Sequence, residues 1–415
     1  MRPVLWTFKI VLWLVVLLLI VVFFILPILT SVLVNNAELL TPTNLKKYLE
    51  FADFIQIWTM RFFIVTWCFF LGSCLASFLN VVAWRLPRGQ SILGSSHCPN
   101  CNFKLSFIRD NVPVVGWIRN NGQCRGCKQS IPPRYLIVEL ILGAAFLLIS
   151  LVTLWGGGIT LPLRVPNALV GFERSLYEPK WDLVQLVGYH LVLSCFLFTF
   201  ALIRMERLKI PFSVVAFGLL IGFAMPLIWP SMHLANHLPS QTQPAVFSPF
   251  SADHLLTLGL GALVGALMGG MIDQFFGTSK SMPADTRSRT MTYGLALVGL
   301  YLGFQSVISV VIIWSLFRIV MRATPAWQSN LASLLFASFI VHLLSWRLGS
   351  AVGYWPSPTS SALQLGIAVA LSIGLLGLHS SQPVSQAELS SEANTPKSDS
   401  SDSQVSDSQV SDSIE

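Results

Sequence analysis

Charged residues are scarce in this 415-residue chain. Lys, Arg, Asp and Glu together make up 11% of it, whereas hydrophobic residues make up 53% and the mean hydropathy is +0.67. A soluble multidomain protein carries more surface charge than this, so the composition excludes that class. Long apolar runs separated by short loops predict an all-α polytopic membrane protein with about 9–10 transmembrane helices.

Acidic residues are the scarcest charged group, with 19 of them against 26 Lys and Arg. Residues 380–415 hold seven acids and one lysine, so the rest of the chain carries a net charge near +13. The basic excess lies in short loops between apolar runs and not on an aromatic-rich face. This distribution of basic residues indicates how the chain is oriented in a membrane, where lipid surrounds it. It argues against a nucleic-acid partner.

Cysteine is also uncommon, but four of the seven cysteines form two CxxC pairs: Cys98, Cys101, Cys124 and Cys127. Two such pairs separated by a short loop are typical of a closed tetrahedral site, and they predict structural Zn²⁺. Two disulfides or a metal-free site are the alternatives. The loop is strongly basic, which favours a cytosolic location, where thiols stay reduced and zinc is the expected occupant.

The residues around these cysteines resemble the amino-terminal domain of the bacterial type IV prepilin peptidases. The family typically reads GSFLNV..RLP, CP.C, DN.P..SW, C..C and I..RYP.VEL. This chain has GSCLASFLNVVAWRLP followed, at matching offsets, by Asp110-Asn111-Val112-Pro113, Gly116-Trp117, Arg134-Tyr135 and Val138-Glu139-Leu140. The resemblance implies an intramembrane aspartyl protease that cleaves pilin or pseudopilin-like precursors and methylates the new amino terminus with S-adenosylmethionine.

Composition and motif positions divide the chain into four segments. They are an extra transmembrane helix with its link (1–56), a peptidase-like N-terminal domain (57–155) whose cytosolic tetra-cysteine loop spans 84–134, a degenerate peptidase-like helical bundle (183–378) and a disordered, acidic, Ser-rich tail (379–415). Spans are expected at 10–34, 57–82, 135–155, 183–203, 210–229, 255–276, 291–320 with a turn at Gly303, 331–346 and 362–378. This count of ten places both termini in the cytoplasm and the protein in the bacterial inner membrane.

The aspartate pair of the family is missing at the expected positions. Alignment of the family's two motifs puts its first aspartate at Arg204 and its second at Met291. Arginine stays protonated and a thioether is neither an acid nor a base, so these side chains cannot activate water. We therefore expect no confident catalytic residue and a proteolytically inactive member, a pseudoenzyme.

Other carboxylates are few in the predicted bundle. Between residues 183 and 379 there are only Glu206, Asp253, Asp273 and Asp285. A shifted pair of Glu206 with Asp285 is the low-probability substitute, although neighbouring arginines explain both residues as surface ion pairs. Glu139 lies about one turn inside the predicted third span, where an unpartnered carboxylate is costly, so we expect it to anchor the loop, with Arg134 or another basic residue as its partner.

Three functions remain open. The first is a family member without proteolysis that still binds pilin-like precursors. The second is an active peptidase and methyltransferase that uses the shifted carboxylate pair, and the third is a non-enzymatic membrane scaffold with a zinc module. No glycine-rich loop for S-adenosylmethionine is visible in the sequence.

Overall fold

The computed structural model describes residues 51–106, 109–162, 164–166, 179–229, 252–276, 289–321, 330–352, 355–357 and 360–380, together with Ile25 and Met232. Apart from Ile25, the predicted span 10–34 lies outside these residues. So do Asp285 and the predicted acidic tail beyond Ser380.

Helices supply the regular structure of the described residues, apart from two isolated β-bridges. They are α3 (Phe51–Arg85), η2 (Leu86–Arg88), α4 (Val115–Arg119), α5 (Arg134–Ile149), η3 (Ser150–Trp155), α7 (Trp181–Met205), α8 (Phe212–Ile228), α9 (Ala252–Phe276), α10 (Thr290–Leu302), α11 (Phe304–Val320), α13 (Leu331–Ala351) and α14 (Ala362–Ser380). The predicted all-α fold is confirmed. The turn predicted at Gly303 is also confirmed, because its φ of 88° ends α10 and α11 starts at the next residue.

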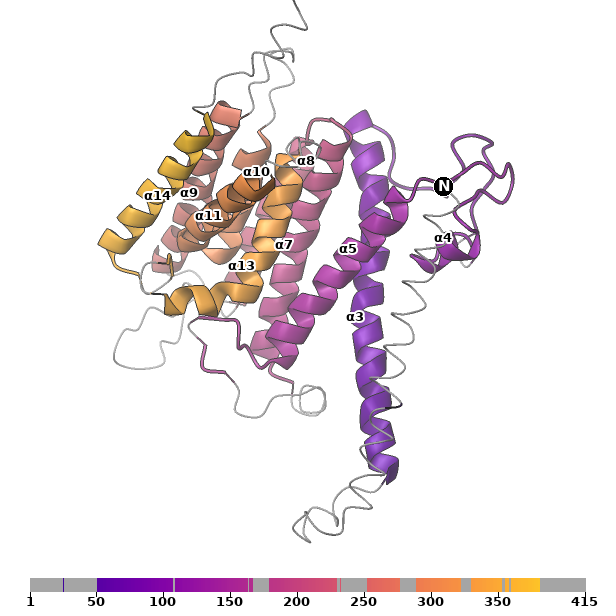
Figure 1. Cartoon of the computed structure of the whole chain (residues 1–415), viewed down its shortest axis with the longest axis horizontal. Coiled ribbons are helices and arrows are strands. Elements are labelled where there is room, and N and C mark those ends of the chain that lie inside the picture. The colour runs from indigo at the N-terminus through magenta and orange to yellow at the C-terminus, as the bar shows by residue number, and fades with distance from the viewer. Residues whose placement is uncertain are drawn as a thin grey trace, which may run out of the picture.

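Five of these helices are long and apolar enough to cross a membrane: Ile57–Arg88, Arg134–Trp155, Trp181–Met205, Leu255–Phe275 and Leu331–Ala351. Four shorter apolar helices, α8, α10, α11 and α14, bring the described total to nine, in line with the predicted number. The protein is therefore a polytopic helical membrane protein. Figure 1 shows α3 and α5 at one side of the bundle and the cysteine-bearing loop beyond them.

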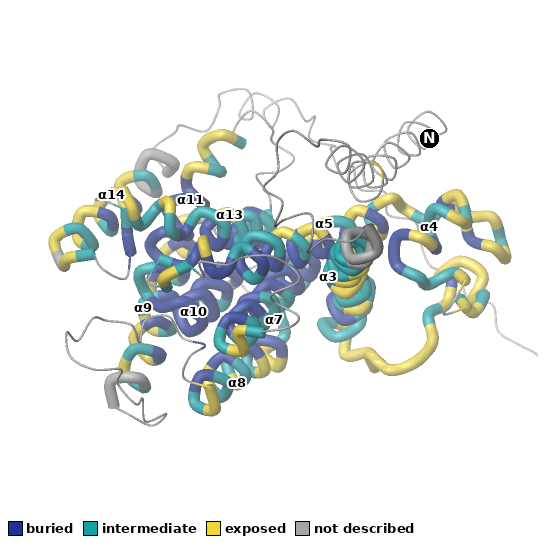
Figure 2. Tube along the Cα trace, turned by 90° about the horizontal axis from the view of Figure 1, so that it is seen from below, coloured by how far each residue is buried: buried dark blue, intermediate teal, exposed yellow. Residues whose placement is uncertain are grey.

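Helix α10 forms the centre of the bundle. It is apolar around its whole circumference and is packed against α7, α8, α9, α11 and α13, as expected for a helix enclosed by others. Its 13 residues span only about 20 Å, less than a bilayer core of about 30 Å. Buried residues concentrate on α7 and α10 in Figure 2, whereas the cysteine-bearing loop is mostly exposed.

Helix α9 approaches α10 until the two backbones touch. A Cβ atom added at Gly261, Gly265 or Gly269 would overlap a backbone carbonyl of α10. These glycines recur every four residues, so they lie on one face of α9 and allow the close approach. This glycine face of α9 is in contact with α10 along its length.

One end of the bundle faces the cysteine-bearing loop, and we call it the module face. Helix α3 ends there and α5 begins there. Ion-pair and hydrogen-bond contacts place the end of α7 and the ends of α9 and α10 that meet each other on the same side. Ser309, near the start of α11, donates to the Pro356 carbonyl just before α14, so α14 starts at the opposite end and finishes at the module face.

Candidate functional site

The tetracysteine module, residues 84–134, holds its four cysteines in two similar turns. Each CxxC motif lies in a short hairpin closed by an isolated bridge. The residue after the second cysteine is left-handed in both, with φ of 53° at Asn102 and 60° at Lys128. Their amides donate to the carbonyls of Cys98 and Cys124 at 2.9 Å. This repeated geometry turns both pairs of thiols toward one point.

The four Sγ atoms lie within 4.8 Å of one another. The distance from Cys98 Sγ to Cys127 Sγ is 3.9 Å, as is the distance from Cys101 Sγ to Cys124 Sγ. A tetrahedral Zn²⁺ site with bonds of about 2.3 Å separates its sulfurs by about 3.8 Å, whereas a disulfide needs about 2.05 Å. The spacing therefore fits the metal site and not the two disulfides.

The protonation of these thiols also fits a cation at the centre. The backbone N–H of Gln129 and the side chain of Asn100 lower the pKa of Cys127 to about 6. Although the backbone N–H of Phe103 acts in the same direction on Cys101, burial and the neighbouring cysteines raise the pKa of Cys101 to about 12. Four thiolates therefore cannot coexist at neutral pH without a positive ion between them.

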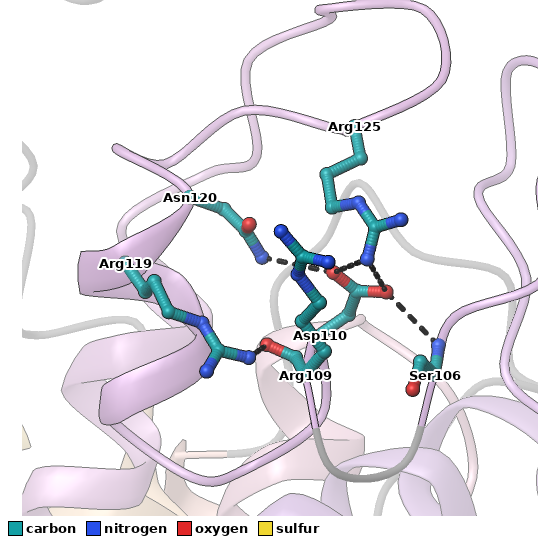
Figure 3. Close-up of polar contacts among 6 residues, drawn as sticks. All are labelled: Ser106, Arg109, Asp110, Arg119, Asn120 and Arg125. Atoms are coloured by element: carbon teal, nitrogen blue, oxygen red, sulfur yellow. Dashed lines mark hydrogen bonds and ion pairs between the residues drawn. The ribbon is translucent and has the colours of Figure 1, made fainter.

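Asp110 organises the loop between the two cysteine pairs (Figure 3). Its carboxylate accepts hydrogen bonds from the Ser106 amide at 3.0 Å and from Asn120 Nδ2 at 3.2 Å, and it forms an ion pair with Arg125 at 3.4 Å. Burial alone would raise the pKa of Asp110, but these hydrogen bonds and the Arg125 charge together lower it. The carboxylate thus joins the middle of the loop to the second cysteine pair.

Glu139 anchors the module to the membrane helices, as predicted, but through a different partner. Its Oε2 accepts the backbone N–H of Val114 at 2.7 Å, and its own carbonyl accepts the Ser73 hydroxyl of α3 at 3.1 Å. Val114 has a φ of 63°, which is strained for a β-branched residue. The prediction that a basic residue such as Arg134 would pair with Glu139 is wrong, because Arg134 pairs with Glu206.

Arg134 instead forms an ion pair with Glu206, which follows the end of α7. Their side chains are 36% and 16% exposed, so the pair is partly shielded from water. This contact joins the start of α5, directly after the module, to the α7–α8 turn of the bundle. Glu206 therefore lies in a link between module and bundle, and its proposed partner Asp285 lies outside the described residues.

The two positions that the resemblance assigns to aspartates come together at a third residue, Asp273. Its carboxylate accepts the backbone N–H of Met291 at 3.1 Å and of Thr292 at 2.8 Å, and it also accepts the Thr292 hydroxyl at 2.8 Å. These amides belong to the first turn of α10, so Asp273 satisfies donors that the helix cannot satisfy itself.

Arg204 is the cationic partner of this buried carboxylate. Asp273 is only 6% exposed, and the Arg204 guanidinium interacts with it electrostatically while donating to the Leu208 carbonyl at 3.0 Å. The ends of α7, α9 and α10 therefore meet at one polar cluster of Arg204, Asp273, Met291 and Thr292. We call it the Asp273 cluster.

Sequence reasoning counted Asp273 among the four bundle carboxylates but assigned it no role. A signal for it was present, because Asp273 continues the four-residue steps of Gly261, Gly265 and Gly269. A residue at the next step of that stripe lies on the face of α9 that touches α10. The carboxylate therefore had to point at the backbone of α10.

A helical membrane bundle that carries a basic tetracysteine loop between its first two described spans defines the class of this protein. Residues 70–153, from α3 through the module into η3, match the Bacterial Peptidase A24 N-terminal domain. The match to this family domain is confined to that stretch, about a fifth of the chain.

Three relatives illustrate the similarity. The Type 4 prepilin-like proteins leader peptide-processing enzyme of Escherichia coli O78:H11 is 41% identical over 100 residues, which cover 20% of this chain and 37% of that protein. The Prepilin leader peptidase/N-methyltransferase of Myxococcus xanthus is 44% identical over 79 residues, covering 19% and 23%. The enzyme of the same name from Pectobacterium carotovorum is 31% identical over 161 residues, covering 32% and 56%.

The chain thus spans between 23% and 56% of the length of these curated relatives. No solved structure matches it. The domain match ends at residue 153, before α7 begins, so it does not include the helices that carry the Asp273 cluster.

Proposed function

We propose that the protein is an inner-membrane member of the prepilin peptidase family that binds pilin or pseudopilin-like precursors without cleaving them. The tetracysteine module lies in the cytosol, both termini are cytoplasmic, and residues 183–378 form a degenerate peptidase-like bundle. The module holds one structural Zn²⁺ through its four cysteines. The basic loops on the module face support this orientation, because Lys and Arg accumulate on the cytoplasmic side.

The Asp273 cluster is the observation that carries the proposal. Arg204 and Met291 come from α7 and α10, nearly ninety residues apart, yet the Met291 amide donates to Asp273 and the Arg204 charge acts on the same carboxylate. Two aspartates at these positions would lie near each other at the end of the bundle. This proximity supports a peptidase-like arrangement of helices in which an arginine and a methionine replace the two carboxylates.

The side chains of the Asp273 cluster are unsuited to activating water. An aspartyl mechanism needs two adjacent carboxyl groups that share a proton, so that one accepts a proton from water and the other polarises the scissile carbonyl. Asp273 is the only acid in the cluster, and both its oxygens accept hydrogen bonds from α10. Arg204 and Met291 supply no second carboxyl group with which Asp273 could share a proton.

A cleavage assay tests the proposal directly. The purified full chain is incubated with a type IV prepilin in detergent, next to an active family member, and leader release is followed by mass spectrometry. We expect no release by this chain, and therefore no methylation of a new amino terminus when S-adenosylmethionine is added. Release that disappears in both Glu206→Gln and Asp285→Asn would instead establish an active peptidase that uses the shifted pair.

Restoring the carboxylates sharpens the test. The triple variant Arg204→Asp, Met291→Asp and Asp273→Asn places aspartates at both family positions and leaves an amide oxygen to accept the α10 amides. We expect leader release at least about tenfold above the assay background that the unmodified chain gives. Asp273→Asn alone is the matched control and should release nothing.

Precursor binding separates the proposal from a scaffold role. Photo-crosslinking of the prepilin to the full chain in nanodiscs should label the bundle near the Asp273 cluster. An excess of unlabelled precursor should remove the labelling, whereas an excess of an unrelated single-span helix should not. Absence of specific labelling would leave the non-enzymatic scaffold as the better description.

A further inference from the structure

The tetracysteine module has a one-sided charge. Residues 84–134 contain eight Lys and Arg and one acid, Asp110, which gives +7. Four thiolates with one divalent ion contribute −2, so +5 remains. The Asp110 side chain is only 3% exposed and is paired with Arg125. The surface of the module therefore presents basic groups with no exposed carboxylate among them.

Six of the basic residues are exposed: Arg88, Lys104, Arg109, Arg119, Arg125 and Lys128. The hairpins that hold the cysteines carry Lys104 and Lys128, one in each, so the backbone positions of both lysines are fixed by the same geometry as the metal site. Arg119 is fixed by donating to the Arg109 carbonyl (Figure 3). A rigid set of cations loses less conformational entropy on binding an anionic partner than a flexible set would.

The chain itself contains a segment of opposite charge. Residues 381–415 hold seven Asp and Glu and one lysine, which gives −6, and they include the repeat SDSQVSDSQVSDS. This segment follows α14, which ends at Ser380 on the module face. The acidic segment therefore starts on the same side of the membrane as the basic module.

The segment is long enough to reach the module. Helices α14, α11, α13, α7 and α3 pack in a row, each on the next. Neighbouring helix axes lie about 10 Å apart, so about four such steps separate α14 from α3. A random coil of thirty-five residues has a root-mean-square span of about 33 Å, and a fully extended chain of that length reaches about 120 Å. A tether of this length gives the segment a local concentration near the millimolar range at the module.

We propose that the acidic segment 381–415 docks on the basic surface of the tetracysteine module. The opposite charges of the segment and the module, and the tether that joins them, favour this occupant. The docked segment shields the cations from other anionic ligands. It does so reversibly, because the contact is electrostatic and salt weakens it.

Zero-length crosslinking of the full chain tests the proposal. The protein is placed in phosphatidylcholine nanodiscs and treated with a carbodiimide, which joins carboxylates to amines in contact. We expect amide bonds between the acids of 381–415 and Lys104 or Lys128, identified by mass spectrometry. Their yield should fall when salt is raised from about 0.1 M to about 1 M, where the Debye length shrinks from about 10 Å to about 3 Å.

Charge-removal variants locate the docking surface while leaving the reactive lysines in place. Arg88→Gln, Arg109→Gln and Arg119→Gln combined should reduce the yield at Lys104 and Lys128 roughly tenfold, which corresponds to about 1.4 kcal/mol. The matched control, Arg207→Gln with Lys209→Gln and Arg289→Gln, removes three charges on the same face outside the module and should change the yield less than about twofold. Unchanged zinc content would show that the module remains folded in both.

Three outcomes overturn the proposal. They are crosslinks confined to Lys209 in the unmodified chain, an equal loss of module crosslinks in both variants, and loss of these crosslinks when phosphatidylglycerol is included in the nanodiscs. The last result would show that anionic lipid is the preferred occupant of the module.

Discussion

The tetracysteine module has all four of its metal ligands, and their sulfurs lie 3.9 Å apart in the two pairs that join the CxxC turns. The bundle is different. The positions assigned to catalytic aspartates carry Arg204 and Met291, yet the helices that hold them still meet at Asp273. One cluster thus keeps a full set of four possible metal ligands, whereas the other, at the positions that the resemblance assigns to aspartates, has a single carboxylate.

This difference follows from what holds each region together. The module is small and has little apolar surface to bury, so its fold depends on its metal ligands. Loss of one cysteine would therefore remove both metal binding and the fold of the module. The bundle is held by apolar surfaces and by the glycine face between α9 and α10. Two side chains at its end can change without disturbing that packing, so architecture can survive where chemistry does not.

The largest expected effect is on the module when one ligand is removed. Cys124→Ser should reduce bound zinc from one equivalent to a small fraction. It should also open the module, because metal binding supplies several kcal/mol of its folding free energy. Limited trypsin digestion after the basic residues of 84–134, together with metal analysis, measures both.

Cys195→Ser is the matched control, because Cys195 lies in α7, away from the cluster. It should keep its zinc and its resistance to trypsin. If the Cys124→Ser module stays resistant without metal, the contrast drawn between ligand-dependent module and packing-dependent bundle is wrong.

Removal of Asp273 should have the next largest effect. Asp273→Leu leaves the Met291 and Thr292 amides without their acceptor and leaves the Arg204 charge uncompensated, so the free energy of unfolding should fall by about 3–5 kcal/mol. Denaturant titration in detergent measures the change. The double variant Arg204→Met with Asp273→Leu should recover part of it, because the unpaired charge is gone.

An exposed ion pair serves as the control for this experiment. Arg164 and Asp182 pair near the start of α7, where the Asp182 side chain is 45% exposed. Asp182→Asn should cost less than about 1 kcal/mol. Equal costs at Asp182 and Asp273 would mean that the Asp273 cluster contributes no more than a surface contact.

A smaller effect is expected where the module meets the membrane helices. Glu139→Ala removes the acceptor for the Val114 amide and should cost about 1–3 kcal/mol, whereas Glu139→Gln keeps an acceptor oxygen and should cost about 1 kcal/mol. The readout is the rate of trypsin cleavage in the module relative to the bundle. Equal cleavage in the two variants would argue against the hydrogen bond as the anchor.

The smallest effect concerns pH. Hydrogen bonds and Arg125 lower the pKa of Asp110 in the folded module, so this carboxylate stabilises the fold above its unfolded pKa of about 3.9, and the contribution is lost as the pH falls through the lower folded pKa. At pH 7, Asp110→Asn should therefore be less stable by about 1 kcal/mol. The difference should shrink below about pH 4.

Protonation of the cysteine thiolates also destabilises the module at low pH, but it affects Asp110→Asn and the unmodified protein alike. The difference between their pH profiles of denaturation therefore isolates the carboxylate. A constant difference between pH 7 and pH 3 would show that Asp110 acts through packing alone.

The helices and the metal ligands could be predicted from local patterns. Apolar runs marked the described spans, the Gly303 turn divided a run too long for one helix, and the CxxC spacing identified four ligands that the structure brings within 4.8 Å. Both signals are contained within a few neighbouring residues. Long-range partners were harder, because the partner of Glu139 was expected to be basic and is the amide of Val114.

The sequence by itself determined that the chain is a helical membrane protein, that its basic loop holds a tetracysteine cluster, and that the family's aspartate positions carry an arginine and a methionine. These properties reside in side-chain chemistry and in short-range periodicity. Only the tertiary structure decided that Glu206 pairs with Arg134 and that Asp273 joins Arg204 to the start of α10. Those contacts depend on how helices distant in sequence pack, and the backbone approach that glycines allow between α9 and α10 sets which polar groups meet.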